Sequence, residues 1–318
     1  MILPGATLGV LGGGQLGQMF ALAARRVGYG VWVLDPDPDC PAAAVADRHL
    51  CAAYDDIHAL RELTATCAAV TTEFENVPLA ALERVAREVP MHPGVGAVAI
   101  AQDRAREKAF FRDLNLAVAP FAVLRSAADL ATAAAAVPFP AILKTARLGY
   151  DGKGQIDVAS AADLAAAWIS LGEKEAVLEG RVALAQELSI ILARTIDGMM
   201  VFYPVAENIH YRGVLDLSIV PARAVEPLQE QARNSAARIA GALDYVGVLA
   251  VEFFVGWRRS TVGERDGAPS SQQWSLYRGR LCAQSVRSAG ADPLRSATRG
   301  YPPDQPCGDD ELAGRSLG

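Results

Sequence analysis

Short apolar runs alternate with amphipathic stretches along most of the chain, and this pattern predicts an α/β fold. Short apolar runs bounded by glycine, proline or acidic residues are typical of buried strands. Stretches with hydrophobic residues three and four apart are typical of helices that cover a sheet. The predicted strands are residues 6–11, 29–34, 68–72, 139–143, 176–178, 186–194 and 246–255. The predicted helices run from the first glycine turn to Arg26 and over residues 77–89, 100–115 and 227–243.

The composition narrows the classes of protein that this pattern allows. The 318 residues are 51% hydrophobic but only 7% aromatic, and their formal net charge is −6. This length has room for about two or three domains, and the negative charge argues against a nucleic-acid-binding surface. The apolar N-terminus lacks the basic start of a signal peptide and is too short to span a membrane. The five cysteines form no C-x-x-C pair, which is typical of a reduced, cytoplasmic protein.

A glycine turn follows the first predicted strand. Gly12, Gly14 and Gly17 match the pattern G-x-G-x-x-G, and Asp35 ends the next predicted strand. This is the spacing of a dinucleotide-binding fingerprint, with an acid placed for a ribose. Such a turn equally serves another anionic ligand at the N-terminus of a helix, so both interpretations stay open.

Two acidic residues, Glu73 and Glu75, follow the predicted strand 68–72. Side chains two residues apart share one face of a strand, and open α/β sheets bind ligands at the carboxyl ends of their strands. The pair therefore predicts a ligand-facing site, and a solvated acidic strand end is the alternative.

The stretch around Lys144 is a candidate phosphate-binding loop, and it is the segment on which the interpretation of the chain depends most. Lys144 ends a predicted strand, and the loop that follows it carries Gly149, Gly152 and Gly154 around Lys153. Glycines let backbone N–H groups approach an anion, and two lysines add point charges for a polyphosphate. The spacing is not that of a P-loop, so a Walker-type NTPase is not predicted. A plain glycine turn between two strands is the alternative.

Two charged features need partners. Glu252 lies inside the apolar run 246–255, where a carboxylate needs a cation or strong donors. Mg²⁺ held by carboxylates and nucleotide phosphates meets that need, whereas an edge strand with Glu252 facing water does not require it. Arg104 and Lys108 stand four apart in the predicted helix 100–115, which places two cations together on a solvated face or around an anion.

The order of these motifs resembles the ATP-grasp superfamily and, within it, the N5-carboxyaminoimidazole ribonucleotide synthases of purine biosynthesis. The segments that carry the resemblance are residues 11–19, 72–77, 102–104, 144, 149–155, 206–210 and 251–254. The resemblance implies a Rossmann-like pre-ATP-grasp domain followed by an ATP-grasp domain. It implies a ligase that uses ATP and Mg²⁺ to carboxylate 5-aminoimidazole ribonucleotide with bicarbonate, and a homodimer. The glycine loop would then also be a lid that excludes water.

The resemblance also implies roles for single residues. Lys153 and Asp151 would be catalytic, and Glu252 would be one ligand of Mg²⁺. The residues facing the ribonucleotide would be Gly14, Gln15, Glu73, Tyr150 and Asp151. The ATP-binding residues would be Arg104, Lys144, Gly149, Tyr150, Asp151, Gly152, Lys153, Gly154, Gln155, Glu179, Gly180, Arg181, Val182, Glu187 and His210.

The chain departs from the family pattern after residue 255. The family's next motif, Asn-Glu-x-Ala-Pro-Arg with a second metal carboxylate, is missing, and the remaining residues are rich in Arg, Ser, Gly and Pro. Such a composition is typical of a disordered tail. Codons chosen for residues 264–275 and read one base later restore Asn-Glu-Met-Ala-Pro-Arg, so we expect an out-of-frame translation. The predicted domains are residues 1–95 (pre-ATP-grasp), 96–255 (incomplete ATP-grasp) and 256–318 (aberrant tail).

Several functions therefore remain open from the sequence. The first is the ligase, with turnover expected to be impaired because the second metal carboxylate is missing. A nucleotide-binding remnant without catalysis is the second, and a sister ATP-grasp enzyme of purine biosynthesis is the third. An NAD-dependent oxidoreductase built on the first glycine turn is the fourth.

Overall fold

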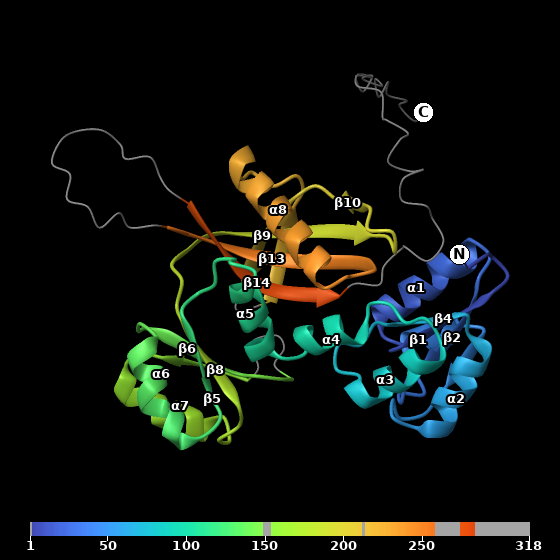
Figure 1. The fold of residues 1–318 in the computed structure, drawn as a ribbon, viewed down its shortest axis with the longest axis horizontal. Coiled ribbons are helices and arrows are strands. Elements are labelled where there is room, and N and C mark those ends of the chain that lie inside the picture. The colour runs from blue at the N-terminus through green and yellow to red at the C-terminus, as the bar shows by residue number, and fades with distance from the viewer. Residues whose placement is uncertain (1, 149–153, 212–213, 258–273, 284–318) are drawn as a thin grey trace, which may run out of the picture.

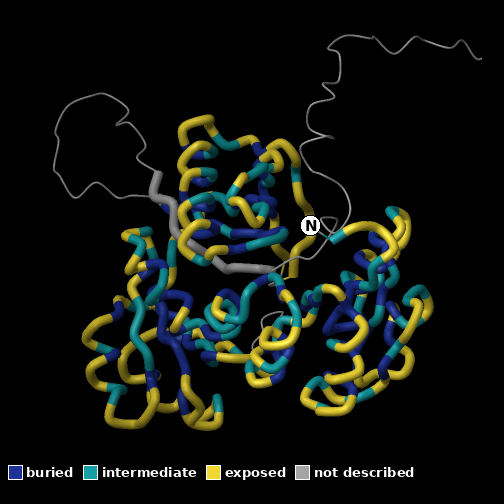
Figure 2. The backbone as a smooth tube through the Cα atoms, turned by 45° about the vertical axis from the view of Figure 1, so that its right-hand side comes forward, coloured by how far each residue is buried: buried dark blue, intermediate teal, exposed yellow. Residues whose placement is uncertain are grey.

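The computed structural model describes residues 2–148, 154–211, 214–257 and 274–283. Its strands form three sheets that follow one another along the chain, and helices pack against each of them (Figure 1). Buried residues concentrate in the strands, and the exposed residues lie on the outward sides of the helices and in the connecting loops (Figure 2). The predicted α/β class is confirmed. Of the helices described, none is long and apolar enough to cross a membrane.

The N-terminal sheet is parallel, with strand order β3-β2-β1-β4. Alternate residues of its central strands point to opposite faces, where one hydrophobic cluster includes α1 and another includes α2 and α3. The predicted strands and the first and third helices are confirmed to within a few residues, whereas β3 and α2 were not predicted. The elements are β1 (Thr7–Leu11), α1 (Gln15–Arg26), β2 (Gly30–Leu34), η1 (Pro41–Ala44), β3 (Arg48–Leu50), α2 (Ile57–Thr66), β4 (Ala69–Thr72) and α3 (Leu79–Glu88).

Two helices connect this sheet to the next one. They are α4 (Val95–Ala101) and α5 (Arg104–Asp113), so the helix predicted for residues 100–115 is confirmed over Arg104–Asp113, while residues 100 and 101 belong to a separate helix. The side chain of Asp103 accepts the backbone N–H groups of Ala105 and Arg106, which starts a new helix at this point. This break sets the direction in which Arg104 and Lys108 project.

The second sheet is antiparallel, with strand order β5-β8-β6-β7. Leu143 and Leu178 pack under its helices, so the next residue on each strand, Lys144 and Glu179, points to the opposite face. This alternation is what presents both charged side chains away from the core. The elements are β5 (Phe121–Leu124), η2 (Ala127–Asp129), α6 (Leu130–Ala136), β6 (Ala141–Thr145), β7 (Gln155–Val158), η3 (Ala161–Asp163), α7 (Leu164–Ser170) and β8 (Ala176–Gly180).

The third sheet has the strand order β12-β11-β9-β13-β14, with β10 paired to β9. Val251, Phe253 and Val255 of β13 form a buried core with α8, so Glu252 and Phe254 lie on the other face. The predicted strands 186–194 and 246–255 and the predicted helix 227–243 are confirmed. The elements are β9 (Leu184–Arg194), β10 (Met200–Phe202), β11 (Ala206–Tyr211), β12 (Val214–Ile219), α8 (Glu226–Ala242), β13 (Gly247–Trp257) and β14 (Trp274–Ala283).

The last strand contradicts one expectation from the sequence. No strand was predicted beyond Trp257, yet β14 pairs antiparallel with β13 along the range from Leu249 to Trp257. Strand pairing uses backbone groups, and β13 would otherwise present a long row of N–H and C=O groups at a sheet edge. The remainder of the predicted tail lies outside the described residues.

Gly17 offers a test of how closely α1 packs on the first strand. A Cβ atom at Gly17 would lie 2.5 Å from the carbonyl oxygen of Gly12, which is backbone and has little freedom to move. We predict that Gly17→Ala lowers the free energy of unfolding by about 1–3 kcal/mol through this overpacking. Urea unfolding measures the change.

Gly96 is the matched control for this substitution. It lies in helix α4, is exposed, and has no heavy atom within 4 Å of the position of an added Cβ. Gly96→Ala should leave stability unchanged or raise it by up to ~1 kcal/mol, because alanine favours the helix. Equal effects of the two substitutions would contradict the close packing at Gly17.

Candidate active site

The first glycine turn is closed by an acidic side chain of the protein itself. Gly12 has a φ of +109°, which favours glycine, and the turn leads into α1. The Glu73 carboxylate accepts the backbone N–H groups of Gly14, Leu16 and Gly17. The anion-binding end of α1 is therefore taken by Glu73 rather than presented to a phosphate.

Asp35 is held inside the same turn. Its carboxylate accepts the N–H of Gly13 at 2.7 Å and the hydroxyl of Tyr54 at 2.8 Å, and the residue is buried. A dinucleotide would need Asp35 for its ribose and the turn for its pyrophosphate. Both groups are occupied by internal hydrogen bonds, which contradicts the interpretation of the turn as an NAD site.

Glu73 and Glu75 do not share a face as the sequence predicted. The strand ends at Thr72, and the N–H groups of Glu73 and Phe74 both donate to the carbonyl oxygen of Leu11. The chain bends there, so Glu73 contacts the glycine turn while Glu75 lines a cavity beside α5. Gln102 fixes this bend, because its amide donates to the Glu75 carbonyl at 2.7 Å.

That cavity has a volume of about 180 Å³ and draws residues from the second and third sheets, from α4 and α5, and from the loop after β4. Three of its side chains are basic and four are carboxylates, which is an unusually charged lining. The lining residues are Glu75, Asn76, Ala101, Gln102, Arg104, Glu107, Lys108, Lys144, Ala146, Leu148, Glu179, Glu252 and Phe254.

Lys108, Lys144 and Glu179 meet at one point of the cavity. The ammonium groups of both lysines lie 3.2 Å from the same carboxylate oxygen of Glu179. Burial by itself raises the pKa of Glu179, but the two lysines outweigh it and hold that pKa below its ordinary value. Lys108 was not among the predicted site residues, although its four-residue spacing from Arg104 was the signal that could have found it.

Arg104 and the β6–β7 hairpin bound the cavity on another side. The Arg104 guanidinium donates to the carbonyl oxygen of Thr145 at 2.8 Å. The N–H of Thr145 donates to the carbonyl of Gly154, and Gln155 pairs with Lys144 across the hairpin. The predicted residues Gly149, Tyr150, Asp151, Gly152 and Lys153 lie outside the described residues.

The predicted hinge, residues 179–182, connects the second sheet to the third. The N–H of Gly180 donates to the Pro120 carbonyl, and the N–H of Arg181 donates to the Pro140 carbonyl. The Arg181 guanidinium also pairs with Asp157 at 2.8 Å. These bonds fasten the start of the connection, and Val182 lies between them and β9.

Two predicted nucleotide residues, Glu187 and His210, are brought together on β9 and β11. The Nδ1 atom of His210 lies 2.6 Å from a Glu187 carboxylate oxygen, and both side chains are partly buried. The neighbouring polar residues act differently. Glu207 forms a two-point ion pair with Arg223, and the Asn208 amide donates to Ser189, so these two residues stabilise the sheet.

Glu252 is on a central strand, because β13 has β9 on one side and β14 on the other. The alternative of an edge strand facing water is therefore wrong. Its side chain is partly buried and lines the charged cavity with Phe254. Within the described part of the chain, no three Asp, Glu, His or Cys side chains converge to form a metal site.

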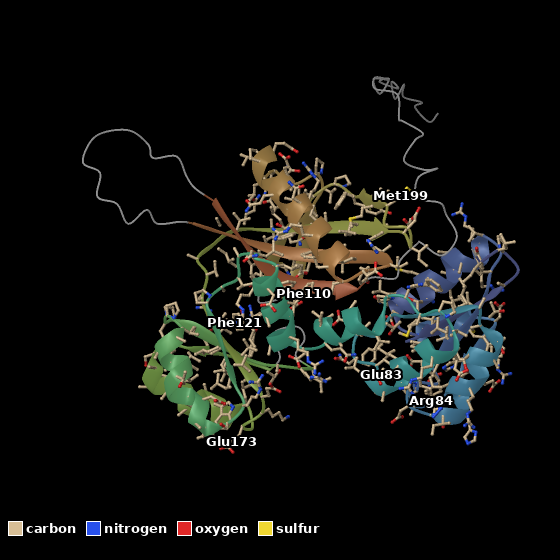
Figure 3. The ribbon with its side chains drawn as sticks, viewed as in Figure 1. Glu83, Arg84, Phe110, Phe121, Glu173 and Met199 are labelled. Carbon is tan, nitrogen blue, oxygen red and sulfur yellow. The ribbon has the colours of Figure 1, made fainter. Side chains whose placement is uncertain are left out.

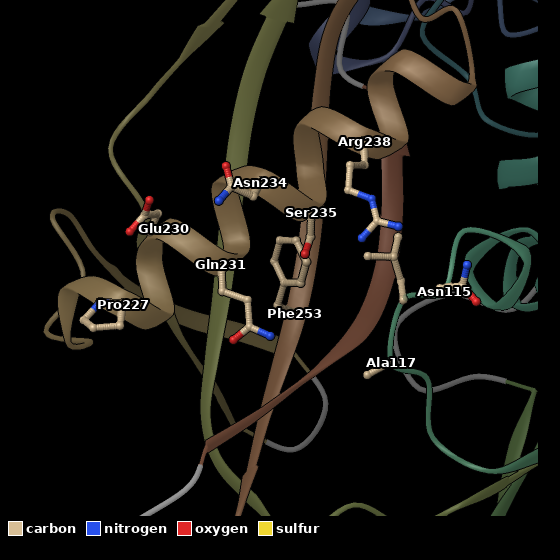
Figure 4. Close-up of a pocket in the computed structure, with 10 residues that line it drawn as sticks. Asn115, Ala117, Pro227, Glu230, Gln231, Asn234, Ser235, Arg238 and Phe253 are labelled. Carbon is tan, nitrogen blue, oxygen red and sulfur yellow. The ribbon is translucent and has the colours of Figure 1, made fainter.

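A larger cavity, of about 500 Å³, lies on the opposite face of β13 (Figure 4). Its lining residues are Asn115, Leu116, Ala117, Pro227, Glu230, Gln231, Asn234, Ser235, Arg238 and Phe253. Arg238 is the one basic side chain among these described residues, and its guanidinium donates to the carbonyl of Leu114. This cavity therefore lacks the convergent cations that distinguish the smaller one.

Models of two protein families match consecutive parts of the chain. A family model for the ribonucleotide synthetase pre-ATP-grasp domain matches residues 5–102, and one for the ATP-grasp domain matches residues 109–264. The chain therefore has the pre-ATP-grasp and ATP-grasp domains of an ATP-grasp protein.

The relatives narrow this class to one family. A curated N5-carboxyaminoimidazole ribonucleotide synthase from Brucella melitensis is 40% identical over 303 residues, which cover 93% of this chain and 83% of that protein. The crystal structure of an N5-carboxyaminoimidazole ribonucleotide synthetase in complex with ADP has 37% identity and a TM-score of 0.80, covering 91% of this chain and 73% of that one. The chain belongs to the family of N5-carboxyaminoimidazole ribonucleotide synthases.

A further structure shows which molecules a relative holds. An N5-carboxyaminoimidazole synthase from Aspergillus clavatus was solved in complex with ADP and 5-aminoimidazole ribonucleotide. It is 28% identical, with a TM-score of 0.74, and the match covers 87% of this chain and 69% of that one.

These matches also bear on the C-terminal segment. Residues 256–318 are about a fifth of the chain, so a match to 93% of it includes part of this segment. The shifted frame and the three domain boundaries stay predictions.

Glu73 generates a prediction about pH. Burial raises the pKa of its carboxyl, the N–H of Gly14 opposes this, and the charge of Asp35 adds to the rise. The folded protein therefore holds this proton more tightly than the unfolded chain, whose glutamate titrates at its ordinary pKa. Stability linked to Glu73 is present below that ordinary pKa and is lost as pH rises through the raised pKa.

We predict that the unfolding free energy of the wild type falls relative to that of Glu73→Gln as pH rises from about 4 to 7. Urea unfolding at a series of pH values measures the difference. Glu83→Gln is the control, since Glu83 is exposed on α3 (Figure 3). A difference between wild type and Glu73→Gln that stays constant with pH would show that Glu73 does not titrate as the structure requires.

Proposed function

We propose that this chain is built for the ATP-dependent carboxylation of 5-aminoimidazole ribonucleotide. Bicarbonate would be the second substrate, and N5-carboxyaminoimidazole ribonucleotide, ADP and phosphate would be the products. The observation that carries the proposal is the convergence of Arg104, Lys108 and Lys144 on one cavity between the sheets. The relatives solved with ADP and with the ribonucleotide support the same assignment.

The charges of the cavity suit a nucleotide that arrives with a divalent cation. Three cations attract the phosphates, but the four lining carboxylates would repel them. Mg²⁺ is usually held by one or two carboxylates together with substrate phosphates, and Glu252 on the cavity face of β13 fits that role. When bound, the ion would neutralise charge on the phosphates during transfer.

The two ends of the site differ in what they attract. Around the first glycine turn, Gly14 and the Glu73 carboxylate favour hydroxyl or amine donors over a phosphate, because Glu73 already fills the anion position. Gln15 opens α1 beside them and is exposed. This end would face the ribonucleotide, while the cavity around Lys144 would hold the phosphates of ATP.

The glycine loop between β6 and β7 would supply the catalytic groups. Its ends are fixed at Thr145 and Gly154, and Leu148 lines the cavity at the start of the loop. Asp151 and Lys153 of the loop would act at the reacting groups. The carboxyphosphate expected from bicarbonate and ATP survives only where water is excluded, so the loop would also serve as a lid.

The proposal includes the cellular setting. We place the protein in the cytoplasm as a homodimer without nucleic-acid or membrane partners. The absence of C-x-x-C pairs and the net charge of −6 support the reduced compartment and argue against nucleic acid. The free thiols of Cys40, Cys51 and Cys67 are consistent with this.

Lys144 tests the nucleotide site. Replacing it with alanine removes a cation from the phosphate position, and a hydrogen bond to a charged group contributes about 1.5–3 kcal/mol. Lys144→Ala should therefore weaken ATP binding by about ten- to a hundredfold, measured by calorimetry. Lys174→Ala, the same change at an exposed lysine, should bind ATP as the wild type does. Equal ATP affinities in all three proteins would remove Lys144 from the site.

Turnover tests the ligase against a nucleotide-binding remnant. Because the second metal carboxylate is missing from the written sequence, we predict ATP binding by this chain without appreciable turnover. Restoring the family's reading frame by one base should produce ADP release that requires both bicarbonate and the ribonucleotide. Full turnover by this chain would show that the predicted frame shift is wrong and would support the ligase function. ATP binding without turnover in both forms would favour the remnant.

A further inference from the structure

The contact between Lys108, Glu179 and Lys144 does more than line the nucleotide cavity. Both lysines approach one oxygen of Glu179, so one carboxylate is shared by two cations. The three residues come from different elements: Lys108 from α5, Lys144 from β6 and Glu179 from β8. The group therefore carries one net positive charge.

The two lysines are not equivalent. The side chain of Lys108 is 6% exposed, and its ammonium lies 5.6 Å from the centre of the Phe121 ring, which adds a cation–π attraction. Phe121 is the first residue of β5 (Figure 3). The side chain of Lys144 is 20% exposed and stands near the end of its strand. Lys108 is thus enclosed, while Lys144 is open to the cavity.

This asymmetry decides which charge a ligand can use. The Glu179 side chain is only 12% exposed, and a buried carboxylate without a cation is strongly unfavourable. If Lys108 were removed, Lys144 would be the cation that remains on Glu179. Lys144 would then have to leave an otherwise uncompensated buried charge in order to contact a phosphate.

We propose that Lys108 is a positioning residue that neutralises Glu179, so that the charge of Lys144 is available to the phosphates of the nucleotide. The inference rests on the proposed function, because it assumes that ATP occupies this cavity. It assigns Lys108 no contact with the nucleotide. Its effect passes through Glu179 to Lys144.

A double substitution separates this role from a direct contact. Lys108→Met keeps the length of the side chain but removes its charge, and ATP binding by the full chain should weaken about tenfold. Glu179→Gln removes the charge that Lys108 neutralises, so Lys108→Met/Glu179→Gln should bind ATP within about threefold of Glu179→Gln alone. Lys108→Arg, which keeps the charge, should also bind near the wild-type level.

Calorimetric titration with ATP in magnesium-containing buffer measures these affinities, and thermal unfolding checks each fold. Lys174→Met is the matched control at an exposed position of the same domain and should change neither quantity. Wild-type affinity in Lys108→Met would overturn the inference. A tenfold loss on adding Lys108→Met to Glu179→Gln would also overturn it, because it would indicate a direct contact or a purely structural role.

Two further outcomes are distinguishable. If the wild type itself does not bind ATP, the proposed function fails before the role of Lys108 is reached. If Lys108→Met alone does not fold, the comparison passes to the double variant. Equal ATP affinities of the double variant and Glu179→Gln support the inference, and weaker binding by the double variant contradicts it.

Discussion

The buried carboxylate of Glu179 is the constraint on which the charged cavity depends. It ties α5 to two neighbouring strands of the second sheet through lysines at 3.2 Å. An unneutralised carboxylate at this depth would be too unfavourable to persist, so the helix must bring Lys108 to it. Asp103 makes that approach possible, because it ends the α4 region and starts α5 in a new direction.

In the N-terminal domain, the groups that need partners are backbone N–H donors, and the partners are acidic side chains. Its glycine turn and the first turn of α1 present several N–H groups, which would ordinarily attract an external anion. Asp35 and Glu73 accept those N–H groups instead. Acidic side chains thus fill the glycine turn, whereas Arg104, Lys108 and Lys144 gather at the charged cavity. The family relatives with ADP and with the ribonucleotide are consistent with such a two-ended site.

Local sequence signals were sufficient for most of the fold and for part of the site. Apolar runs located the long strands, and glycine spacing located the first turn and the loop after Lys144. The same signals failed where the deciding contact is distant. Lys108 was assigned no role because its partner Glu179 is far away in the chain, and β14 was missed because strand pairing does not require a periodic sequence.

By itself, the sequence determined the α/β class, the order of the two domains and the positions of Lys144 and Glu252 on apolar strands. The α/β class and the two positions follow from the pattern of apolar residues, whose alternation puts successive side chains of a strand on opposite faces, whereas the order of the domains follows from the motifs that resemble the family. Only the tertiary structure decided that Glu73 and Glu75 separate, that Glu187 meets His210, and that two lysines share Glu179. Such pairings depend on how elements bend and pack, and the energy of a buried charge is set by neighbours that periodicity does not reveal.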